Sequence, residues 1–318
     1  MTTYNIVCVA DESYAQHAAV LLVSLFETNK THQFDVYLFT FMMTEETKKK
    51  LHELVQYYGQ KIHIIEDTYN LAHLDQMNTA TSHKSWNSII YLKLFILRYL
   101  PCAAMRCLFL DVDMVIRTDI APLYEMDLRG AVIAGCEDYL YSISHRERLH
   151  LKYTAKYINS GVMVIDLAAW QKMEAERPMV DFLHSVKTQV SNEQDVIALY
   201  FQNHIIYIHY KWNATTFCFQ RIPRIFPKYS PQLDEVRNHP CIIHFCEPVK
   251  PWFRECKHPY KWVYRKYLSL TPWKKDRFPS CKRVGKLSAR KYLLRYWLNR
   301  LRVLKDFNYE IPIQTNNH

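Results

Sequence analysis

The segment Asp111-Val112-Asp113 carries the strongest chemical signal in the sequence. It follows the apolar run 106–110, which we expect to be a buried strand. Residues i and i+2 of an extended backbone point to the same side, so both carboxylates can bind one cation. Hard oxygen ligands suit Mg²⁺ or Mn²⁺, which usually share their coordination with substrate phosphates. We therefore predict a divalent-metal site here; the alternative is that both carboxylates are solvated or cap a helix.

A second group of candidate residues lies at the end of the apolar run 241–245, which we also expect to be a strand. His244 belongs to that run, and Lys250 follows it. An imidazole that joins two carboxylates favours Mn²⁺ over Mg²⁺, and a lysine can place a cation on a phosphate. Alternatively, His244 is a hydrogen-bonded core residue and Lys250 is solvated.

The small number of glycines limits how a phosphate could be bound. The chain has five glycines in 318 residues, and none of them forms a G-x-G-x-x-G turn or a Walker A loop. Phosphate sites of these two kinds, which use backbone N–H groups, are therefore excluded. We expect a metal ion or side chains to hold any phosphate.

Apolar runs alternate with helical patterns over the first 66 residues, which predicts a parallel, doubly wound α/β sheet. Ligands of such sheets bind at the carboxyl ends of the strands, where Asp11 lies. We expect strands at 5–10, 34–41, 62–65, 106–110, 131–136, 157–166 and 241–245, and helices after Ser13 and at 44–58, 88–100, 167–186 and 192–201.

Five motifs in order give the chain a resemblance to a known family. They are VADESY (9–14), LFLDVDMV (108–115), YINSGV (157–162), NEQD (192–195) and HFCEPVKPW (244–252). Together they resemble glycosyltransferase family 8, and within it the bacterial lipopolysaccharide and lipooligosaccharide α-galactosyltransferases and α-glucosyltransferases. The resemblance runs from Tyr4 to about Tyr267.

The resemblance implies a fold and an activity. The fold would be of the GT-A type, with a Rossmann-like, mostly parallel central sheet and helices on both faces. Independently of the resemblance, a stretch near 271–280 with Pro, Trp and Lys marks a boundary between the catalytic domain, residues 1–270, and a basic helical tail, residues 271–318. The enzyme would move a hexose, galactose or else glucose, from a UDP-sugar to a lipid-linked oligosaccharide of lipopolysaccharide or lipooligosaccharide, with retention of configuration. Its cofactor would be Mn²⁺, with Mg²⁺ as the alternative.

The resemblance also assigns roles to residues. Asp111, Asp113 and His244 would hold the metal, and Lys250 would hold the diphosphate. Asp11 would accept a hydrogen bond from the uracil, and Tyr14 would stack on it. Asp138 and Asn159 would contact the donor sugar, with Gln194 beside the anomeric carbon. The remaining donor-site residues would be Val9, Ala10, Ser13 and Val112, and Glu193 is a further candidate catalytic residue.

Several of these roles have structural alternatives. Tyr14 could be a core aromatic and Asn159 a turn residue. Glu193 and Asp195 are alternative carboxylates for the catalytic role, but both could instead be acids that the first turn of a helix favours. Glu137 could take the role of Asp138.

Retention by a glycosidase-like route needs a nucleophile on the face opposite the leaving group. Gln194 is a neutral amide and a poor nucleophile. We therefore expect the acceptor hydroxyl to attack from the front face, with the departing phosphate oxygen taking its proton.

Four positions depart from the pattern of the family, and two of them are Ser13, which replaces an amide, and Glu193, which replaces an aspartate. Many relatives carry an arginine in the helix before the D-x-D motif, a position that Tyr91 would occupy here. Glu247 stands near the diphosphate site, where similar relatives have glycine. Tyr91 in place of the arginine removes an expected contact to a sugar hydroxyl or a phosphate, so the choice between galactose and glucose stays open.

Net charge is +10, and its excess lies near the C-terminus. Twelve Lys and Arg and one acidic residue fall between Lys274 and Lys305. Apolar and aromatic residues from Leu287 onward share one helical face, which is typical of a helix at a membrane surface. We expect this tail to bind an anionic membrane, at the inner face of the cytoplasmic membrane. No nucleic-acid partner is expected, because the body of the chain has no such motif.

Nine scattered cysteines without a C-x-x-C pair indicate a reduced, cytoplasmic protein.

Two other functions compete with this interpretation. The residues around Asp111 also fit the D-x-D-x-(T/V) pattern of haloacid-dehalogenase phosphatases, in which Asp111 would be the nucleophile. That fold usually places the motif at the N-terminus. A non-catalytic binder of nucleotide sugars is the second alternative, and it predicts binding without turnover.

Overall fold

The chain divides into two compact units. The computed structural model describes residues 3–66, 88–139, 141–219, 230–274, 278–281 and 294. The first unit comprises residues up to Ala18, 29–112 and 119–208, and the second comprises 19–28, 113–118 and the residues from His209 onward. Helix α1 (Ala15–Thr28) contributes residues to both units.

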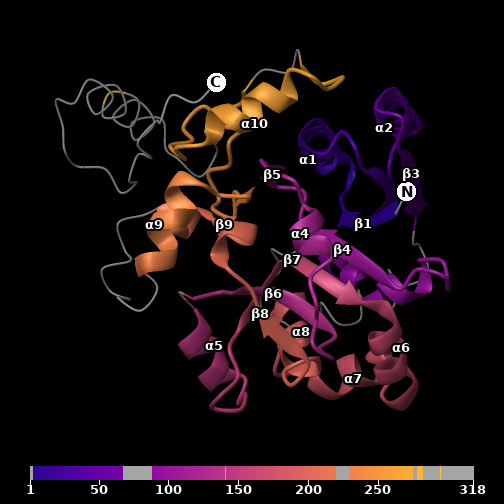
Figure 1. Ribbon diagram of the computed structural model, residues 1–318, viewed down its shortest axis with the longest axis vertical. Helices are drawn as coiled ribbons and strands as arrows, with labels where there is room; N and C mark the ends of the chain where they lie inside the picture. Colours follow the sequence, from indigo (N-terminus) through magenta and orange to yellow (C-terminus); the bar gives the residue numbers. More distant parts are fainter. Residues whose placement is uncertain are drawn as a thin grey trace. The chain divides into compact units, whose positions relative to one another are not determined.

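A seven-stranded sheet forms the centre of the first unit, in the order β3-β2-β1-β4-β7-β6-β8 (Figure 1). The strands are β1 (Thr3–Val9), β2 (Gln33–Thr40), β3 (Lys61–Glu66), β4 (Arg106–Leu110), β6 (Ile133–Glu137), β7 (Ile158–Asp166) and β8 (Ile205–Tyr207). Strand β1 pairs in parallel with β2 and β4, as do β2 with β3 and β6 with β8. Strand β7 runs antiparallel to both β4 and β6. The sheet is therefore mostly parallel, as predicted, but not wholly so.

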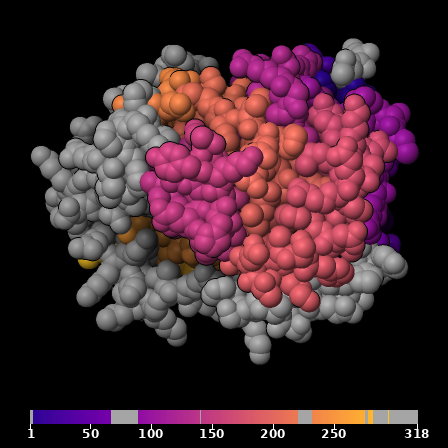
Figure 2. Space-filling view, turned by 90° about the horizontal axis from the view of Figure 1, so that it is seen from below, coloured from indigo at the N-terminus to yellow at the C-terminus, as the bar shows by residue number. Residues whose placement is uncertain are grey.

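Both faces of this sheet are covered. Successive side chains of a strand point to opposite faces of a sheet. Because Ile6, Val7 and Cys8 of β1 are all fully buried, neither face is open to solvent at this strand. One face packs on η2 (Ser88–Arg98), α6 (Leu167–Glu176), α7 (Met179–Val186) and α8 (Glu193–Tyr200). Helix α2 (Glu45–Tyr57) packs beside β3, and α4 (Ala121–Tyr124) follows β5 in the chain. The short helix α5 (Ser142–Arg148) is at the surface, within the magenta area at the centre of Figure 2.

Two helices differ from the sequence prediction. The segment expected as a helix over 88–100 is a 3₁₀ helix that ends at Arg98 and is interrupted at Phe95 (φ −115°, ψ 19°). The helix expected over 167–186 is two helices, because Pro178 has no N–H to donate and disfavours helical backbone at Arg177. Arg177 is accordingly extended (φ −143°, ψ 90°), and α7 begins at Met179.

A three-stranded sheet lies in the second unit. Strand β10 (Ile242–His244) pairs antiparallel with β5 (Met114–Ile116) and parallel with β9 (Ala214–Thr215). The sequence predicts β10, but β5 and β9 are too short for an apolar pattern to reveal. This unit also contains η3 (Tyr210–Asn213), η4 (Thr216–Phe219), α9 (Ser230–Asn238) and α10 (Lys261–Leu268).

Most of the expected basic tail, residues 282–293 and 295–318, lies outside the described residues, and the domain boundary at 270 stays a prediction. In the part of the chain that the structure describes, no helix has both the length and the apolar character that crossing a membrane requires.

The buried His258 of the second unit gives stability a pH dependence. Its ring packs on Phe219, Phe245 and Tyr260, and its Nδ1 accepts a hydrogen bond from the N–H of Tyr260 (3.2 Å). Burial lowers the pKa of His258 from 6.5 to about 3. The unfolded chain therefore binds a proton more tightly, so stability falls as the pH drops from 6.5 towards 3.

We expect the protonation of His258 in the unfolded chain to make the free energy of unfolding about 2 kcal/mol lower at pH 5 than at pH 7.5. Urea unfolding at both pH values measures this. His258→Phe keeps an aromatic ring and should remove that part of the pH dependence, whereas His184→Gln, at an exposed position, should not. Equal pH dependence in wild type and His258→Phe would contradict the assignment.

Candidate active site

The turn after β1 is held together by the side chain of Asp11. Asp11 Oδ1 accepts hydrogen bonds from the N–H of Tyr14 (3.0 Å) and from Ser13 Oγ (2.7 Å). Val9 ends the strand, and the N–H of Ala10 donates to Phe39 O (3.0 Å). The Tyr14 side chain is 38% exposed, so the structural alternative of a core aromatic is wrong. These five predicted donor-site residues thus lie in one turn at the carboxyl end of β1, and the Tyr14 ring is open to a ligand.

Asp111, at the carboxyl end of β4, is paired with a buried lysine. Lys93 Nζ lies 3.1 Å from Asp111 Oδ1 and 3.1 Å from Glu193 Oε1, and Lys93 is 3% exposed. Burial alone would lower the pKa of Lys93, but the two carboxylates outweigh it and raise that pKa. Burial raises the pKa of Glu193. Lys93 opposes this rise, and the negative charge of Asp111 adds to it. Lys93 is therefore the residue of η2 that contacts the Asp111 carboxylate.

Asp113 lies between two cationic or potentially cationic groups of the second unit. Its Oδ1 is 3.2 Å from His244 Nε2, and its Oδ2 is 2.6 Å from Lys250 Nζ. Burial alone would raise the pKa of Asp113, but Lys250 and His244 outweigh it and hold that pKa well below its usual range. Lys250 Nζ also donates to Phe245 O (2.6 Å), so the lysine is fixed beside the carboxylate. Asp113 is therefore ionised at every pH at which the protein would be assayed.

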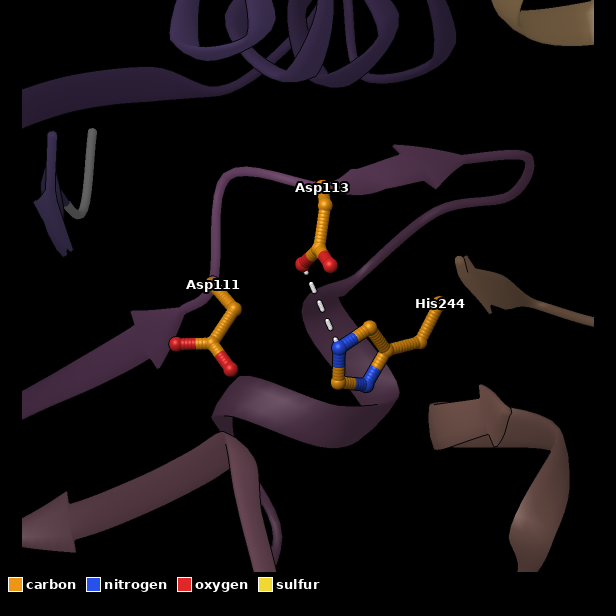
Figure 3. A group of neighbouring side chains, drawn as sticks. All are labelled: Asp111, Asp113 and His244. Atoms are coloured by element: carbon orange, nitrogen blue, oxygen red, sulfur yellow. Dashed lines mark ion pairs between the residues drawn. The ribbon is translucent and has the colours of Figure 1, made fainter. Parts of the chain in front are cut away.

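The three predicted metal ligands come together. Asp111, Asp113 and His244 each offer one ligand atom, and these atoms lie within 4.8 Å of one another. Figure 3 shows the two carboxylates and the imidazole pointing toward one another. Val112, between the two aspartates, is buried (6% exposed), which is expected if its side chain points away from the side on which the two carboxylates lie. Two carboxylate oxygens and one imidazole nitrogen form a donor set that fits Mn²⁺ or Mg²⁺.

Asn213 fixes the orientation of the His244 ring. Asn213 is fully buried at the end of η3, and its Oδ1 lies 3.0 Å from His244 Nδ1. An amide oxygen can only accept, so Nδ1 donates in this contact, and Nε2 is the ring nitrogen that lies on the side of Asp113. An outer hydrogen bond of this kind is usual for histidines that bind metal ions.

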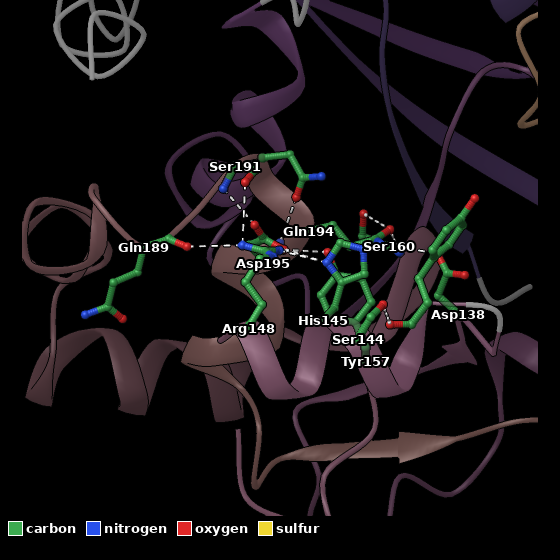
Figure 4. Close-up of polar contacts among 12 residues, drawn as sticks. Asp138, Ser144, His145, Arg148, Tyr157, Ser160, Gln189, Ser191, Gln194 and Asp195 are labelled. Atoms are coloured by element: carbon green, nitrogen blue, oxygen red, sulfur yellow. Dashed lines mark hydrogen bonds and ion pairs between the residues drawn. The ribbon is translucent and has the colours of Figure 1, made fainter. Parts of the chain in front are cut away.

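Two of the predicted sugar-binding residues, Gln194 and Asp138, form a second group within the first unit (Figure 4). Gln194 Oε1 accepts from the N–H of Ser160 (3.0 Å), and Gln194 Nε2 donates to Asp138 Oδ2 (3.4 Å). Asn159, at 9% exposure in β7, accepts from the N–H of Gly161 through its Oδ1 (3.2 Å). The structure thus brings Gln194 and Asp138 together, and it places Asn159 next to Ser160. Glu193 is separate from them and bonded to Lys93.

Sequence analysis missed two residues of the site, Lys93 and Asn213. A single lysine within the apolar segment Ile89–Ile96 is a weak signal that this position is buried and paired. Asn213 lies 31 residues before His244 in the sequence, and nothing in its neighbourhood marks it. Both act on residues that sequence analysis did identify.

Comparison with known proteins agrees with this geometry. Residues 5–256 match the family model described as Glycosyl transferase family 8. General stress protein A of Bacillus subtilis (strain 168) is 29% identical over 280 residues, which cover 85% of this chain and 94% of that protein. A Lipopolysaccharide 1,2-glucosyltransferase of Escherichia coli is 25% identical over 282 residues, which cover 86% of this chain and 80% of that protein.

The solved structure of galactosyltransferase LgtC, in complex with donor and acceptor sugar analogues, aligns with a TM-score of 0.72. The two chains are 18% identical, and the alignment covers 84% of this chain and 96% of LgtC. At this identity the likeness shows the fold alone, which is the GT-A type. Since the family match spans most of the chain and the fold agrees with it, this chain belongs to glycosyl transferase family 8 and is a glycosyltransferase.

Proposed function

We propose that this glycosyltransferase moves a hexose, galactose or else glucose, from a UDP-sugar to a lipopolysaccharide or lipooligosaccharide acceptor, with Mn²⁺ as cofactor. The observation that carries the proposal is the meeting of Asp111, Asp113 and His244 in a member of this family. The acceptor class is supported by relatives whose names include lipopolysaccharide glucosyltransferases. The charges of the site fit a diphosphate leaving group, because a divalent ion and a lysine stabilise the negative charge that develops on it.

In this proposal the donor lies across the residues described above. Tyr14 stacks on the uracil, Asp11 accepts from it, and the rest of the turn, from Val9 to Ser13, lines the nucleoside. Asp111, Asp113 and His244 hold the metal ion, Lys250 contacts the diphosphate, and Val112 keeps the two aspartates on one side. When bound, the ion would supply a positive charge against the leaving group.

The sugar would lie near Asp138, Asn159 and Gln194. The carboxylates next to Gln194 in the sequence already have partners. Glu193 is bonded to Lys93, and the fully buried Asp195 is bonded to Arg148 and Tyr157. A carboxylate fixed in this way is a poor nucleophile, so these contacts favour attack by the acceptor hydroxyl from the front face. We propose retention of configuration by this route. Because the chain belongs to a glycosyltransferase family, the Asp111-Val112-Asp113 segment needs no explanation as a phosphatase motif.

Hydrolysis and thermal stability with a small set of donors test the proposal. We expect UDP-galactose or UDP-glucose to be hydrolysed with Mn²⁺ and not with EDTA, and UDP with Mn²⁺ to raise the melting temperature. UDP-N-acetylglucosamine serves as the competing donor. Turnover of p-nitrophenyl phosphate without any response to UDP-sugars would contradict the proposal. Binding of UDP-sugars without turnover, with acceptor present, would favour the non-catalytic alternative.

Replacing Asn213 should weaken the metal site without removing a ligand. We expect Asn213→Ala to raise the Mn²⁺ concentration needed for half-maximal activity about 10–100-fold, with a smaller effect on the rate at saturating Mn²⁺. Titration of donor hydrolysis with Mn²⁺ measures both. Asn203→Ala, at an exposed asparagine that accepts from Lys152, is the matched control. An unchanged Mn²⁺ requirement would show that Asn213 does not act on His244.

We also propose that the protein works in the cytoplasm, at the inner face of the cytoplasmic membrane, through its basic C-terminal segment. The support is the composition of residues 274–305 and the lipid-linked acceptor. Truncation after about Pro272 should leave donor hydrolysis intact and move the protein from membranes to the soluble fraction. Unchanged membrane partition would contradict this role.

A further inference from the structure

The first turn of α8 is held by a buried carboxylate that lies outside the proposed donor contacts. Asp195 is 0% exposed. Its Oδ1 accepts from Arg148 Nη2 and from the Tyr157 hydroxyl, both at 2.6 Å, and its Oδ2 accepts from the N–H of Ser191 (2.7 Å) (Figure 4). A buried charge is costly unless it is paired and hydrogen-bonded, and here both conditions are met. The Asp195 charge therefore serves the fold.

Tyr157 connects this carboxylate to the end of β6. Its hydroxyl donates to Asp195, and its backbone O accepts from the N–H of Asp138 (2.8 Å). The Tyr157 ring is 1% exposed and stacks on His145 of α5, with ring centroids 4.4 Å apart and planes 11° apart. One rigid aromatic residue thus contacts both the first turn of α8 and the residue that follows β6.

Gln194 lies between these two fixed points. It is the residue before Asp195, and its amide contacts Ser160 N–H (3.0 Å) and Asp138 Oδ2 (3.4 Å). The path from Asp195 through Tyr157 to Asp138 and back through Gln194 is therefore a closed ring of contacts. If the first turn of α8 shifted, the Gln194 amide would move relative to Asp138.

Arg148 ties this ring to α5. Its Nη2 donates to Asp195 and lies 2.7 Å from His145 Nδ1, and its Nη1 donates to Gln189 O (3.2 Å), in the connection that leads to α8. The planar guanidinium can make these contacts at once because its donors are fixed in a fork. No contact described for Arg148 involves a proposed metal or donor-site residue.

We infer that Arg148 and Asp195 are positioning residues: their ion pair, completed by the Tyr157 hydroxyl, fixes the first turn of α8 so that the Gln194 amide meets Asp138 and Ser160. This inference rests on the proposed function, in which Gln194 lies beside the anomeric carbon. Neither residue contacts the donor, and both act through Gln194. A displacement of about 1 Å at a reacting centre can cost about 10²-fold in rate.

The test compares Arg148→Met with Arg148→Lys, Tyr157→Phe and a control on the same helix. Arg146→Met is that control, because Arg146 contacts Tyr153 and lies outside the ring of contacts. We expect Arg148→Met to lower kcat for donor hydrolysis about 10²-fold while the donor KM stays within about twofold. Arg148→Lys should restore part of kcat, and Arg146→Met should match wild type.

Hydrogen exchange gives a readout that does not depend on turnover. We expect faster amide exchange in residues 157–161 and 191–196 of Arg148→Met, because the Ser191 N–H loses a fixed acceptor, and wild-type exchange elsewhere. If Arg148→Met does not fold, Tyr157→Phe decides, since it keeps the ion pair and loses one hydrogen bond. Its kcat should fall about tenfold, with faster exchange in the same two segments.

Wild-type exchange in both segments, or an unchanged kcat in both Arg148→Met and Tyr157→Phe, would overturn the inference. A parallel loss in kcat, donor KM and exchange throughout the chain would also overturn it, because that is the signature of a general structural role. If wild type hydrolyses none of the UDP-sugars, the proposed function fails, and the exchange comparison still decides whether the ion pair fixes α8.

Discussion

Asp113→Asn is expected to lower Mn²⁺-dependent hydrolysis of the donor by about 10³-fold or more. Asp113 is the carboxylate on which His244 (3.2 Å) and Lys250 (2.6 Å) converge, and it belongs to the group of three ligand atoms within 4.8 Å. Asparagine keeps an acceptor oxygen and the same size but loses the charge that binds the ion. If the ion supplies several kcal/mol to the transition state, a loss of about 4 kcal/mol corresponds to that factor.

The controls for this substitution separate chemistry from folding. The variant replaces the charged acceptor of Lys250 with a neutral amide oxygen, which costs about 1–3 kcal/mol of stability, so assays belong well below the melting temperature. Asp119→Asn is the matched control, because Asp119 is 54% exposed and pairs with His32. It should keep wild-type activity. Full activity of Asp113→Asn at the wild-type Mn²⁺ requirement would remove this carboxylate from the metal site.

Six of the seven strands in the central sheet of the first unit could be predicted, because each is an apolar run with a polar residue at its end; the three-residue strand β8 was missed. Strand β4 and the aspartates after it are an example, and the N–H of Asp111 bonds to Gly161 O of β7 (2.8 Å). The direction of β7 could not be predicted in this way, because pairing depends on which distant strands become neighbours. The break at Pro178 was available from the sequence, since the residue before a proline avoids helical backbone.

Site residues could be predicted where they lie at the end of a predicted strand or within a motif of the family. Asp111, Asp113 and His244 were found in this way, and Gln194 and Asp138 came from the resemblance. The residues that hold them were not found, because their partners are far away in the sequence. Lys93 is 18 residues from Asp111 and 100 from Glu193. Such a lysine is indistinguishable from one on the surface until both carboxylates are placed.

Lys93 also yields the largest expected effect on stability. It is 3% exposed, and its ammonium lies 3.1 Å from a carboxylate oxygen of both Asp111 and Glu193. The other oxygen of Glu193, Oε2, is buried and accepts no hydrogen bond from the described residues. Lys93→Met keeps the length of the side chain but leaves two neighbouring carboxylates without their shared cation. We expect a loss of about 3–5 kcal/mol in the free energy of unfolding, measured by urea unfolding.

A second substitution shows whether charge is the cause. In Lys93→Met/Glu193→Gln, the buried carboxylate that lost its partner becomes a neutral amide. The double variant should therefore be more stable than Lys93→Met, with a coupling of about 1–3 kcal/mol between the two positions. Lys49→Met, at a lysine that is 77% exposed, should leave the unfolding midpoint unchanged. If Glu193→Gln brings no recovery, the loss in Lys93→Met comes from packing against Phe109, whose ring centroid lies 4.6 Å from Nζ, and the ion pair does not stabilise the site.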